Sequence, residues 1–248
     1  MRQRAAESTI PQPRHSDAAT ACRTAIGLEV TGSSVRGGPV DLVTGAAAGR
    51  RLTRSFPDDG TAALDRTIHE VTTALGAPGP TGLAFADLPD RDDIHAGDLG
   101  PRFVRSDAAA IAETRYGAGM GRSGLIVMML FDRDIELSLV EDGRLIDSSE
   151  LTAQADRSLL VDNTMAAGRP APTLTEWGHH AHRYLSFVER VLHPDLFIVD
   201  TTRGPTALGL WLHLFRTRTP QVMANLGTES VIVGAAALAA DAAYDAVG

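Results

Sequence analysis

The chain has 248 residues, of which 44% are hydrophobic, and its formal net charge is −8. This length is enough for one large domain or for two lobes that share a core, and the acidic balance gives little support to nucleic-acid binding, which depends on basic patches. All 23 basic side chains are arginine, which excludes a Schiff-base lysine and a P-loop lysine, so arginine, backbone N–H groups or a helix N-terminus would have to hold any anion.

The cysteine content and the apolar runs bear on the cellular compartment. Cys22 is the single cysteine, which excludes an intrachain disulfide and a thiolate zinc cluster and fits a reducing cytoplasm. The first 20 residues lack the apolar core of a signal peptide. The longest apolar run, 231–240, is too short and too rich in alanine to span a bilayer, and it predicts a buried helix. We therefore expect a cytoplasmic protein that contacts neither a membrane nor nucleic acid.

The first part of the chain predicts strands joined by short turns. Residues 1–24 are polar and contain proline and arginine, which is typical of a disordered leader. Residues 26–30 and 35–43 are predicted strands, and residues 46–56 suggest a further turn and strand. Apolar residues at helical spacing predict a helix at 61–75. A strand is predicted at 81–88, and the charged, glycine-containing stretch 89–102 predicts a loop.

The second part of the chain repeats strands and helices. A short helix is predicted at 106–116, with Ser106 as its cap and Asp107 in its first turn. The continuous apolar run 124–131 fits a strand buried on both faces, and 135–146 predicts two strands around an Asp-Gly hairpin turn. The remaining predicted elements are helices at 173–192, 205–215 and 229–247, a buried strand at 195–200, and a short strand with a turn at 219–226.

The order of these elements predicts an α/β arrangement that occurs twice. After the leader, the first arrangement covers 25–103 and the second covers 104–248. We expect an N-terminal and a C-terminal lobe with a cleft between them. A single doubly wound lobe is the alternative that the pattern leaves open.

Several stretches resemble one known family. They are GSSVRGGPVDLVTG (32–45), AETRYGAG (112–119), VLHPDLFIV (191–199), RTP (218–220) and IVGAA (232–236). In this order they resemble bacterial glucokinases of the repressor–ORF–kinase (ROK) family, in its polyphosphate glucokinase group. The resemblance implies an α/β, two-lobed actin-like ATPase (ribonuclease H-like) fold with mixed sheets and a central cleft. It also implies a homodimer, because relatives commonly pair through the second lobe.

The two phosphate-binding loops that the resemblance implies are altered. In the first loop the family has an aspartate and paired glycines, and this chain has Glu29, Val30 and Thr31. In the second loop the family has a Gly-Thr-Gly-Ile-Gly pattern, and this chain has DRDIE, with Asp132 and Asp134. Two charges about 4 Å apart at an effective dielectric constant near 20 interact by about 4 kcal/mol. We expect the acidic side chains to oppose nucleotide or polyphosphate binding.

The catalytic base that the resemblance implies is also missing. The family has an Asn-Asp pair before the AETRYGAG-type helix, and its aspartate takes the proton from the sugar hydroxyl. The two positions here hold Val104 and Arg105, and an arginine cannot act as a general base. Asp107 lies two residues further on and could take this role only after a rearrangement.

Sugar-binding and nucleotide-binding elements depart from the family pattern as well. The Glu-x-Gly-His element keeps Glu150 and lacks the glycine and the histidine. The sugar-binding Asn-Asp pair is absent between Leu88 and Val104, and the Gly-Gly-Gly nucleotide turn becomes VDTTRG at 199–204. These losses favour a homologue that no longer transfers phosphate to glucose and that uses no cofactor and no metal.

Two forms of such a homologue remain open. The first is a binding or regulatory pseudokinase, as a homodimer or as the partner of an active relative. The second is a repurposed enzyme, in which crowded acids with raised pKa values act on another small molecule in the cleft without nucleotide. Its candidate catalytic residues are Glu29, Asp107, Asp132, Asp134 and Arg105. The alternative to both forms is a divergent but active polyphosphate or ATP glucokinase.

A histidine-rich stretch offers a weaker candidate site. His179 and His182 have the spacing of two zinc ligands on one helix. His193 and Asp195 are near in the sequence but sit at the other end of the predicted helix, so we interpret the stretch as a solvated helix face.

Overall fold

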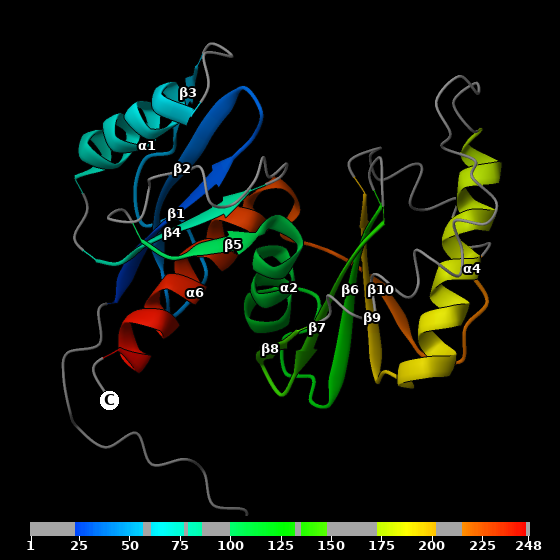
Figure 1. Ribbon diagram of the computed structural model, residues 1–248. Helices are drawn as coiled ribbons and strands as arrows, with labels where there is room; N and C mark the ends of the chain where they lie inside the picture. The colour runs from blue at the N-terminus through cyan, green and yellow to red at the C-terminus, as the bar shows by residue number, and fades with distance from the viewer. Residues whose placement is uncertain are drawn as a thin grey trace, which may run out of the picture.

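The computed structural model describes residues 23–56, 61–76, 79–85, 100–131, 135–147, 173–201 and 215–246. It holds two five-stranded sheets, with helices outside and between them (Figure 1). The first sheet has the order β3-β2-β1-β4-β5, with β1 Thr24–Val30, β2 Ser34–Asp41, β3 Leu52–Ser55, β4 Thr81–Phe85 and β5 Arg102–Val104. The second sheet has the order β10-β9-β6-β7-β8, with β6 Leu125–Phe131, β7 Ile135–Glu141, β8 Arg144–Ile146, β9 Leu196–Thr201 and β10 Gln221–Met223.

The two sheets share one pairing pattern around a central strand. In the first, β1 is antiparallel to β2 and parallel to β4. In the second, β6 is antiparallel to β7 and parallel to β9. Both sheets are therefore mixed, and the predicted twofold occurrence of an α/β arrangement is confirmed. The central strands are almost wholly buried, as expected for strands covered on both faces.

Helices form three layers with the two sheets between them (Figure 1). Helix α1 (Thr61–Leu75) packs Leu64, Ile68 and Val71 on the outer side of the first sheet, and α4 (Leu174–Leu192) covers the outer side of the second. Helices α2 (Arg105–Tyr116) and α6 (Ser230–Asp245) lie between the sheets, where their alanine-rich faces join residues of both sheets in one core. The predicted bounds of the first helix and the buried helix at the last apolar run are confirmed.

Glycines allow the closest backbone approaches in this middle layer. A Cβ atom added to Gly234 of α6 would lie 1.7 Å from the carbonyl oxygen of Ala108 in α2. One added to Gly27 of β1 would lie 1.8 Å from the carbonyl oxygen of Ile232 in α6. Side chains at these positions would push α2, α6 and the first sheet apart, so the glycines fix the spacing of the helices on which the site is built.

Two local predictions have different outcomes. The Asp-Gly hairpin between β7 and β8 is confirmed, since Asp142 and Gly143 both have positive φ there. The prediction that Ser106 caps α2 is wrong, because the helix begins at Arg105 directly after β5 and its N-cap is Val104, in an extended conformation without a side-chain hydrogen bond. Ser106 is buried within the first turn instead, beside Asp107, which is in that turn as predicted.

The last helix complicates a division of the chain by residue number. Helix α6 packs against β1 and β4 of the first sheet through Gly27 and Gly82, although it follows the whole second sheet in the sequence. The predicted boundary between residues 103 and 104 stays a prediction. The helix predicted at 205–215 lies outside the described residues, except for Phe215. Within the described part of the chain, no helix is long and apolar enough to cross a membrane.

Candidate functional site

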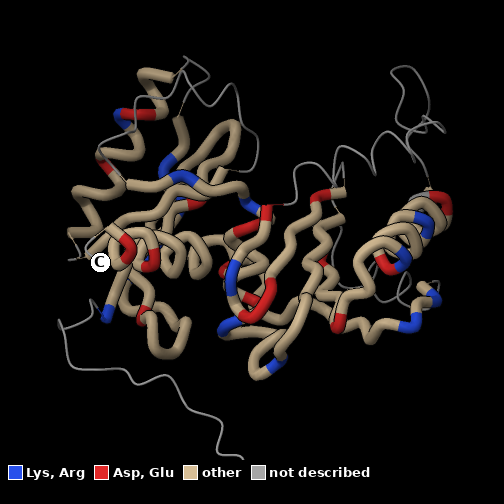
Figure 2. The backbone as a smooth tube through the Cα atoms, turned by 60° about the horizontal axis from the view of Figure 1, so that its bottom comes forward, with Lys and Arg blue, Asp and Glu red and all other residues tan. Residues whose placement is uncertain are grey.

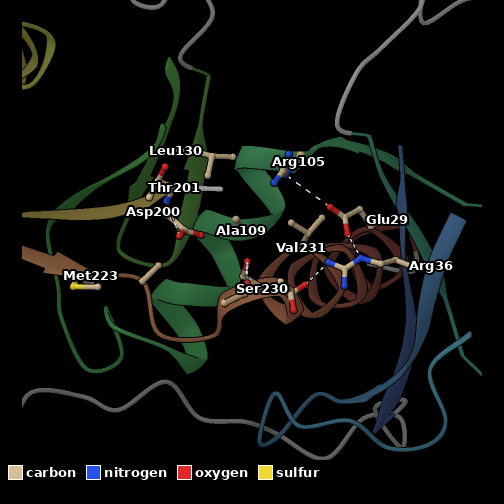
Figure 3. A pocket seen from close by; sticks show the side chains of 13 residues that line it. Glu29, Arg36, Arg105, Ala109, Leu130, Asp200, Thr201, Met223, Ser230 and Val231 are labelled. Atoms are coloured by element: carbon tan, nitrogen blue, oxygen red, sulfur yellow. Dashed lines mark hydrogen bonds and ion pairs between the residues drawn. The ribbon is translucent and has the colours of Figure 1, made fainter. Parts of the chain in front are cut away.

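A pocket of about 420 Å³ lies between the two sheets, where α2 and α6 begin. Glu29 near the end of β1, Leu130 near the end of β6 and Asp200 in β9 contribute its walls from the strands (Figure 3). Ligands of α/β proteins commonly bind outside the carboxyl ends of strands, so the position is typical of a functional site. The other lining residues are Arg36, Arg105, Ala109, Thr201, Met223, Ala224, Gly227, Thr228, Ser230 and Val231.

Glu29 is the most deeply buried carboxylate of the pocket, at 4% exposed. It lies directly opposite Arg36 in the β1–β2 register, and the Arg36 Nε donates a hydrogen bond to its Oε2 (Figure 3). The Arg105 Nε lies 3.8 Å from its other oxygen. Two guanidinium groups from different elements therefore surround one carboxylate, and the charge of Glu29 is compensated within the protein.

Arg36 and Arg105 also connect the pocket to the helices. Arg36 Nη2 donates to the carbonyl oxygen of Thr228, in the short 3-10 helix η2 (Gly227–Glu229) before α6. Arg105 is the first residue of α2, and Ala109, one turn later, lines the same pocket. Basic and acidic residues are interspersed along the described chain (Figure 2), and in this pocket both signs are in direct contact.

Asp200 brings a second carboxylate to the pocket from the second sheet. Its Oδ1 accepts a hydrogen bond from the backbone N–H of Thr201 at 2.7 Å, and the Thr201 hydroxyl donates to the carbonyl oxygen of Phe131. Burial raises the pKa of Asp200 above its usual value, and the Thr201 N–H and the Arg105 guanidinium lower it by less. A carboxyl group of this kind suits proton exchange or hydrogen-bond donation nearer to neutral pH than an ordinary aspartate.

Sequence reasoning did not identify Asp200 as a site residue. The pattern of residues 199–204 indicates only an altered nucleotide turn. The available signal was an acidic residue at the end of the apolar run LFIVD, because the end of a buried strand is where an α/β protein exposes side chains to its ligand.

The predicted site residues divide into three groups. Glu29 and Arg105 lie together in the pocket, and their catalytic role stays a prediction. Asp107 lies in the first turn of α2 but is not one of the residues that line the pocket. Asp132 and Asp134 lie outside the described residues, as does Glu150.

In the hairpin between β1 and β2, the Thr31 side chain accepts hydrogen bonds from backbone amides of the same turn. The Oγ1 of Thr31 accepts hydrogen bonds from the backbone N–H groups of Ser34 at 3.1 Å and of Ser33 at 3.4 Å. The backbone N–H of Thr31 donates to the carbonyl oxygen of Ser34 at 2.9 Å. Amide groups that could face a phosphate in such a hairpin are here used within the turn.

Glu113 of α2 holds the far wall of the pocket in place. It is fully buried, and its two carboxylate oxygens accept backbone hydrogen bonds from Ala118 at 2.9 Å, Asn225 at 3.0 Å and Leu226 at 2.8 Å. The segment 224–228 that it anchors supplies three pocket residues. Glu113 therefore helps to fix the shape of the pocket, although it is not one of the lining residues.

The residues of the described ranges contain no group of three or more histidine, cysteine, aspartate or glutamate side chains placed to hold a metal ion. In α4, the Nδ1 of His182 accepts a hydrogen bond from the backbone N–H of Arg216, and His179 is exposed. His179 thus lies on the surface of α4, and His182 contacts the neighbouring segment at Arg216.

Comparisons with known proteins find sugar kinases among the proteins similar to this chain. No family model matches the chain. The polyphosphate glucokinase of Mycobacterium tuberculosis (strain ATCC 25618 / H37Rv) is 33% identical over 261 residues, which cover 92% of this chain and 96% of that protein. The polyphosphate glucokinase of Mycobacterium leprae (strain TN) is 33% identical over 241 residues, which cover 85% of this chain and 72% of that protein.

Solved structures with a similar fold include sugar kinases and a ROK family transcriptional regulator. The inorganic polyphosphate/ATP-glucomannokinase from Arthrobacter sp. strain KM aligns with a TM-score of 0.68 at 27% identity, over 88% of this chain and 99% of that chain. The ROK family glucokinase from Streptomyces griseus, solved in complex with glucose and AMPPNP, aligns with a TM-score of 0.61 at 16% identity, over 88% of this chain and 99% of that chain.

Proposed function

This chain belongs to the ROK family, as a polyphosphate glucokinase-like member with the actin-like ATPase fold, and from this premise we propose that it binds a small polar molecule in the pocket between its sheets and does not transfer phosphate to glucose. The observation that carries the proposal is the contact of Arg105 and Arg36 with Glu29 in the pocket.

The position of Arg105 argues against proton removal from a sugar hydroxyl. The family resemblance implies a general-base aspartate at this position, at the start of α2. A guanidinium group stays protonated in proteins and cannot accept that proton. In this structure it lies beside Glu29 instead, so a substrate hydroxyl at this place would meet a cation.

The neighbouring phosphate and metal functions are weakened by the same contacts. The family resemblance gives the acidic residue of the first hairpin a role in managing metal and phosphate. Here Glu29 already has Arg36 as its partner, and a divalent cation would have to displace that guanidinium. The hairpin amides of Ser33 and Ser34 are engaged by Thr31, so they offer less to an incoming phosphate chain.

Two forms of this function are compatible with the pocket. In the first, the chain is a binding or regulatory pseudokinase, as a homodimer or together with an active relative. In the second, it is a nucleotide-independent acid–base enzyme, and among the described pocket residues Asp200 is the best-placed proton-exchanging group, because burial raises its pKa while it faces the pocket beside Arg105. Glu29 and Arg105 would then orient the substrate.

A second candidate function is an active sugar kinase with a divergent site. The supporting observation is the identity of 33% to polyphosphate glucokinases over nearly the whole chain. In that case Asp107, in the first turn of α2, would have to serve as the base.

The two candidates are separated by a coupled assay for glucose 6-phosphate. The purified chain is incubated with glucose and Mg²⁺ and either ATP or polyphosphate, beside the Mycobacterium tuberculosis polyphosphate glucokinase as positive control. We expect no product above background and no calorimetric binding of ATP–Mg²⁺ or polyphosphate. Turnover, or micromolar affinity for either phosphoryl donor, would reject the main proposal in favour of the kinase.

The binding form and the enzyme form are separated by Asp200→Asn. If the pocket performs acid–base chemistry, the variant keeps its fold and loses the cellular product that the wild-type chain forms. If the chain is a pseudokinase, the variant leaves the cellular metabolite profile unchanged.

A further inference from the structure

One wall of the pocket is a short connector between the two sheets. Residues 224–229 lead from β10, in the second sheet, to α6, which packs on β1 and β4 of the first sheet. The connector ends in η2, and Ala224, Gly227 and Thr228 line the pocket. None of the three residues of η2 is buried, whereas α6 is buried from Ser230 to Ala239. Hydrogen bonds and ion pairs, more than packing, therefore hold η2 in place.

Glu113 of α2 holds the first half of the connector. Its Oε1 accepts hydrogen bonds from the backbone N–H groups of Asn225 at 3.0 Å and Leu226 at 2.8 Å. The Glu113 side chain is fully buried, and its Oε2 accepts a hydrogen bond from the backbone N–H of Ala118 at 2.9 Å. Asn225 and Leu226 are thereby fixed to α2 by an anchor that water and salt do not reach.

Two arginines from the region of the first sheet hold the second half of the connector. The Nε of Arg51 donates to the Oε2 of Glu229 at 2.7 Å, and its Nη1 donates to the carbonyl oxygen of Pro39 at 2.8 Å. Arg36 of β2 donates to the carbonyl oxygen of Thr228. The side chains of Arg51 and Glu229 are 24% and 43% exposed, so this second anchor, unlike the first, is open to screening by salt.

Gly227 lies between the two anchors. Its φ is +55°, in the left-handed region that glycine adopts without steric cost. Among the described residues, no atom would lie within 4 Å of a Cβ added to it. The backbone can therefore turn at Gly227 while Leu226 stays fixed to Glu113.

We propose that η2 is a movable wall of the pocket, which hinges at Gly227 and is held closed by the ion pair of Arg51 and Glu229. The inference goes beyond the proposed function, because it concerns access to the pocket for any ligand. Arg36 links this wall to the charged residues of the pocket, since it donates both to Glu29 and to Thr228.

Two backbone amides report the position of the wall. The N–H of Glu229 donates to the carbonyl oxygen of Leu226 at 3.2 Å, and the N–H of Ser230 donates to the carbonyl oxygen of Gly227. Both bonds span the hinge or begin at it, so they open when η2 moves. The amides of Asn225 and Leu226 stay bound to Glu113 in either position.

Amide hydrogen exchange of the full chain, followed by NMR without ligand, tests the wall. Raising the salt concentration from about 0.05 M to about 0.5 M screens the exposed ion pair. We expect the amides of Glu229 and Ser230 to exchange faster by about threefold to fivefold, as for loss of an exposed ion pair. Exchange at Asn225 and Leu226 remains unchanged. This arm uses the wild-type chain and needs no variant to fold.

Variants then assign the effect to Arg51. In Arg51→Gln we expect the faster exchange at Glu229 and Ser230 already at low salt, with no further increase at high salt. The matched control is Arg50→Gln, because Arg50 donates to the carbonyl oxygen of Ala74 in α1 and not to the connector. The control removes the same charge from the neighbouring residue, and exchange at Glu229 and Ser230 should remain that of the wild-type chain.

Three results would overturn the proposal. If exchange at Asn225 and Leu226 rises as much as at Glu229 and Ser230, the connector opens as one piece and Gly227 is not the hinge. If neither salt nor Arg51→Gln changes exchange at Glu229 and Ser230, the ion pair does not hold the wall. An equal effect of Arg50→Gln would assign the change to net charge. None of these readouts depends on phosphoryl transfer, so they are independent of the glucose 6-phosphate assay.

Discussion

Two buried carboxylates, Glu113 and Glu29, are stabilised in opposite ways. Glu113 is 0% exposed and accepts three backbone N–H groups, from the loops that follow α2 and precede α6. Glu29 is 4% exposed and is surrounded by the side chains of Arg36 and Arg105. Backbone amides are fixed by the fold and add no countercharge, whereas arginine side chains can turn toward another anion. The first arrangement is suited to holding structure, and the second to exchanging partners with a ligand.

The contrast extends to the regions around the two residues. Around Glu113, α2 and α6 pack through alanines and through Gly234 at backbone contact distance. Around Glu29, the pocket is lined by charged residues together with small and apolar side chains. This difference indicates that packed helices keep the family fold around Glu113. Around Glu29, a few charged residues determine the chemistry of the pocket. Three substitutions test whether the stability of the protein depends on these two regions in different ways.

The largest effect is expected from Gly234→Ala. The added methyl group would meet the Ala108 carbonyl oxygen at 1.7 Å, and because this atom belongs to the backbone of α2, one of the two helices has to move. We expect a loss of about 3 kcal/mol or more in the free energy of unfolding, measured by urea denaturation. Gly32→Ala is the matched control, since a Cβ there meets no atom within 4 Å. Equal stabilities of the two variants would contradict the close packing of α2 and α6.

An intermediate effect is expected from Glu113→Gln. The amide nitrogen of glutamine would face one of the backbone N–H donors that Glu113 now accepts, so one donor loses its partner in a fully buried place. We expect a loss of about 1–3 kcal/mol in the free energy of unfolding.

The control for this substitution is Glu70→Gln, at an exposed glutamate of α1. It removes the same charge without removing a buried acceptor, and its stability should remain near that of the wild-type chain. If both variants lose the same stability, net charge rather than the hydrogen bonds of Glu113 is responsible.

The smallest effect, and one of opposite sign, is expected from Asp200→Asn. The pKa of Asp200 is raised in the folded chain above its ordinary value of 3.8, so the folded state binds the proton more tightly than the unfolded state. Its contribution to stability is therefore full at pH values below 3.8 and is lost as the pH rises through the folded pKa. Asparagine does not titrate, so the stability of the variant does not fall in this way as the pH rises.

Thermal unfolding of both proteins across pH measures the difference. We expect the variant to be the more stable by less than about 1 kcal/mol at neutral pH, because the Thr201 N–H and Arg105 already offset part of the burial cost. The gap should close on acidification toward pH 3.8. A variant that is less stable at neutral pH would show that Asp200 acts as a structural anion, like Glu113, and would remove the contrast between the two regions.

Much of the fold was predictable because it depends on local hydrophobic pattern. The helix at 61–75, the buried strand near 124–131 and the Asp-Gly hairpin follow from spacing and turn chemistry. The cap at Ser106 was not predictable in this way, because the strand β5 runs directly into α2 and moves the start of the helix to Arg105.

The site was predictable only in part. Glu29 and Arg105 were identified because they depart from a family pattern, and they do come together in the pocket. Asp200 was missed, since nothing local to 199–204 indicates that β9 lies beside β6 with its end at the same pocket.

The sequence by itself determined the residue types of this protein's chemistry: arginines without lysine, an arginine at the start of α2, and an acidic residue in the first hairpin. Tertiary structure alone decided which of them meet. Glu29 and Arg105 are 76 positions apart in the numbering (105 − 29) and belong to different elements, and their contact exists because glycine-mediated packing brings α2, α6 and β1 together. Charge interactions depend on distance and burial, and both are properties of the packed chain rather than of neighbouring residues in the sequence.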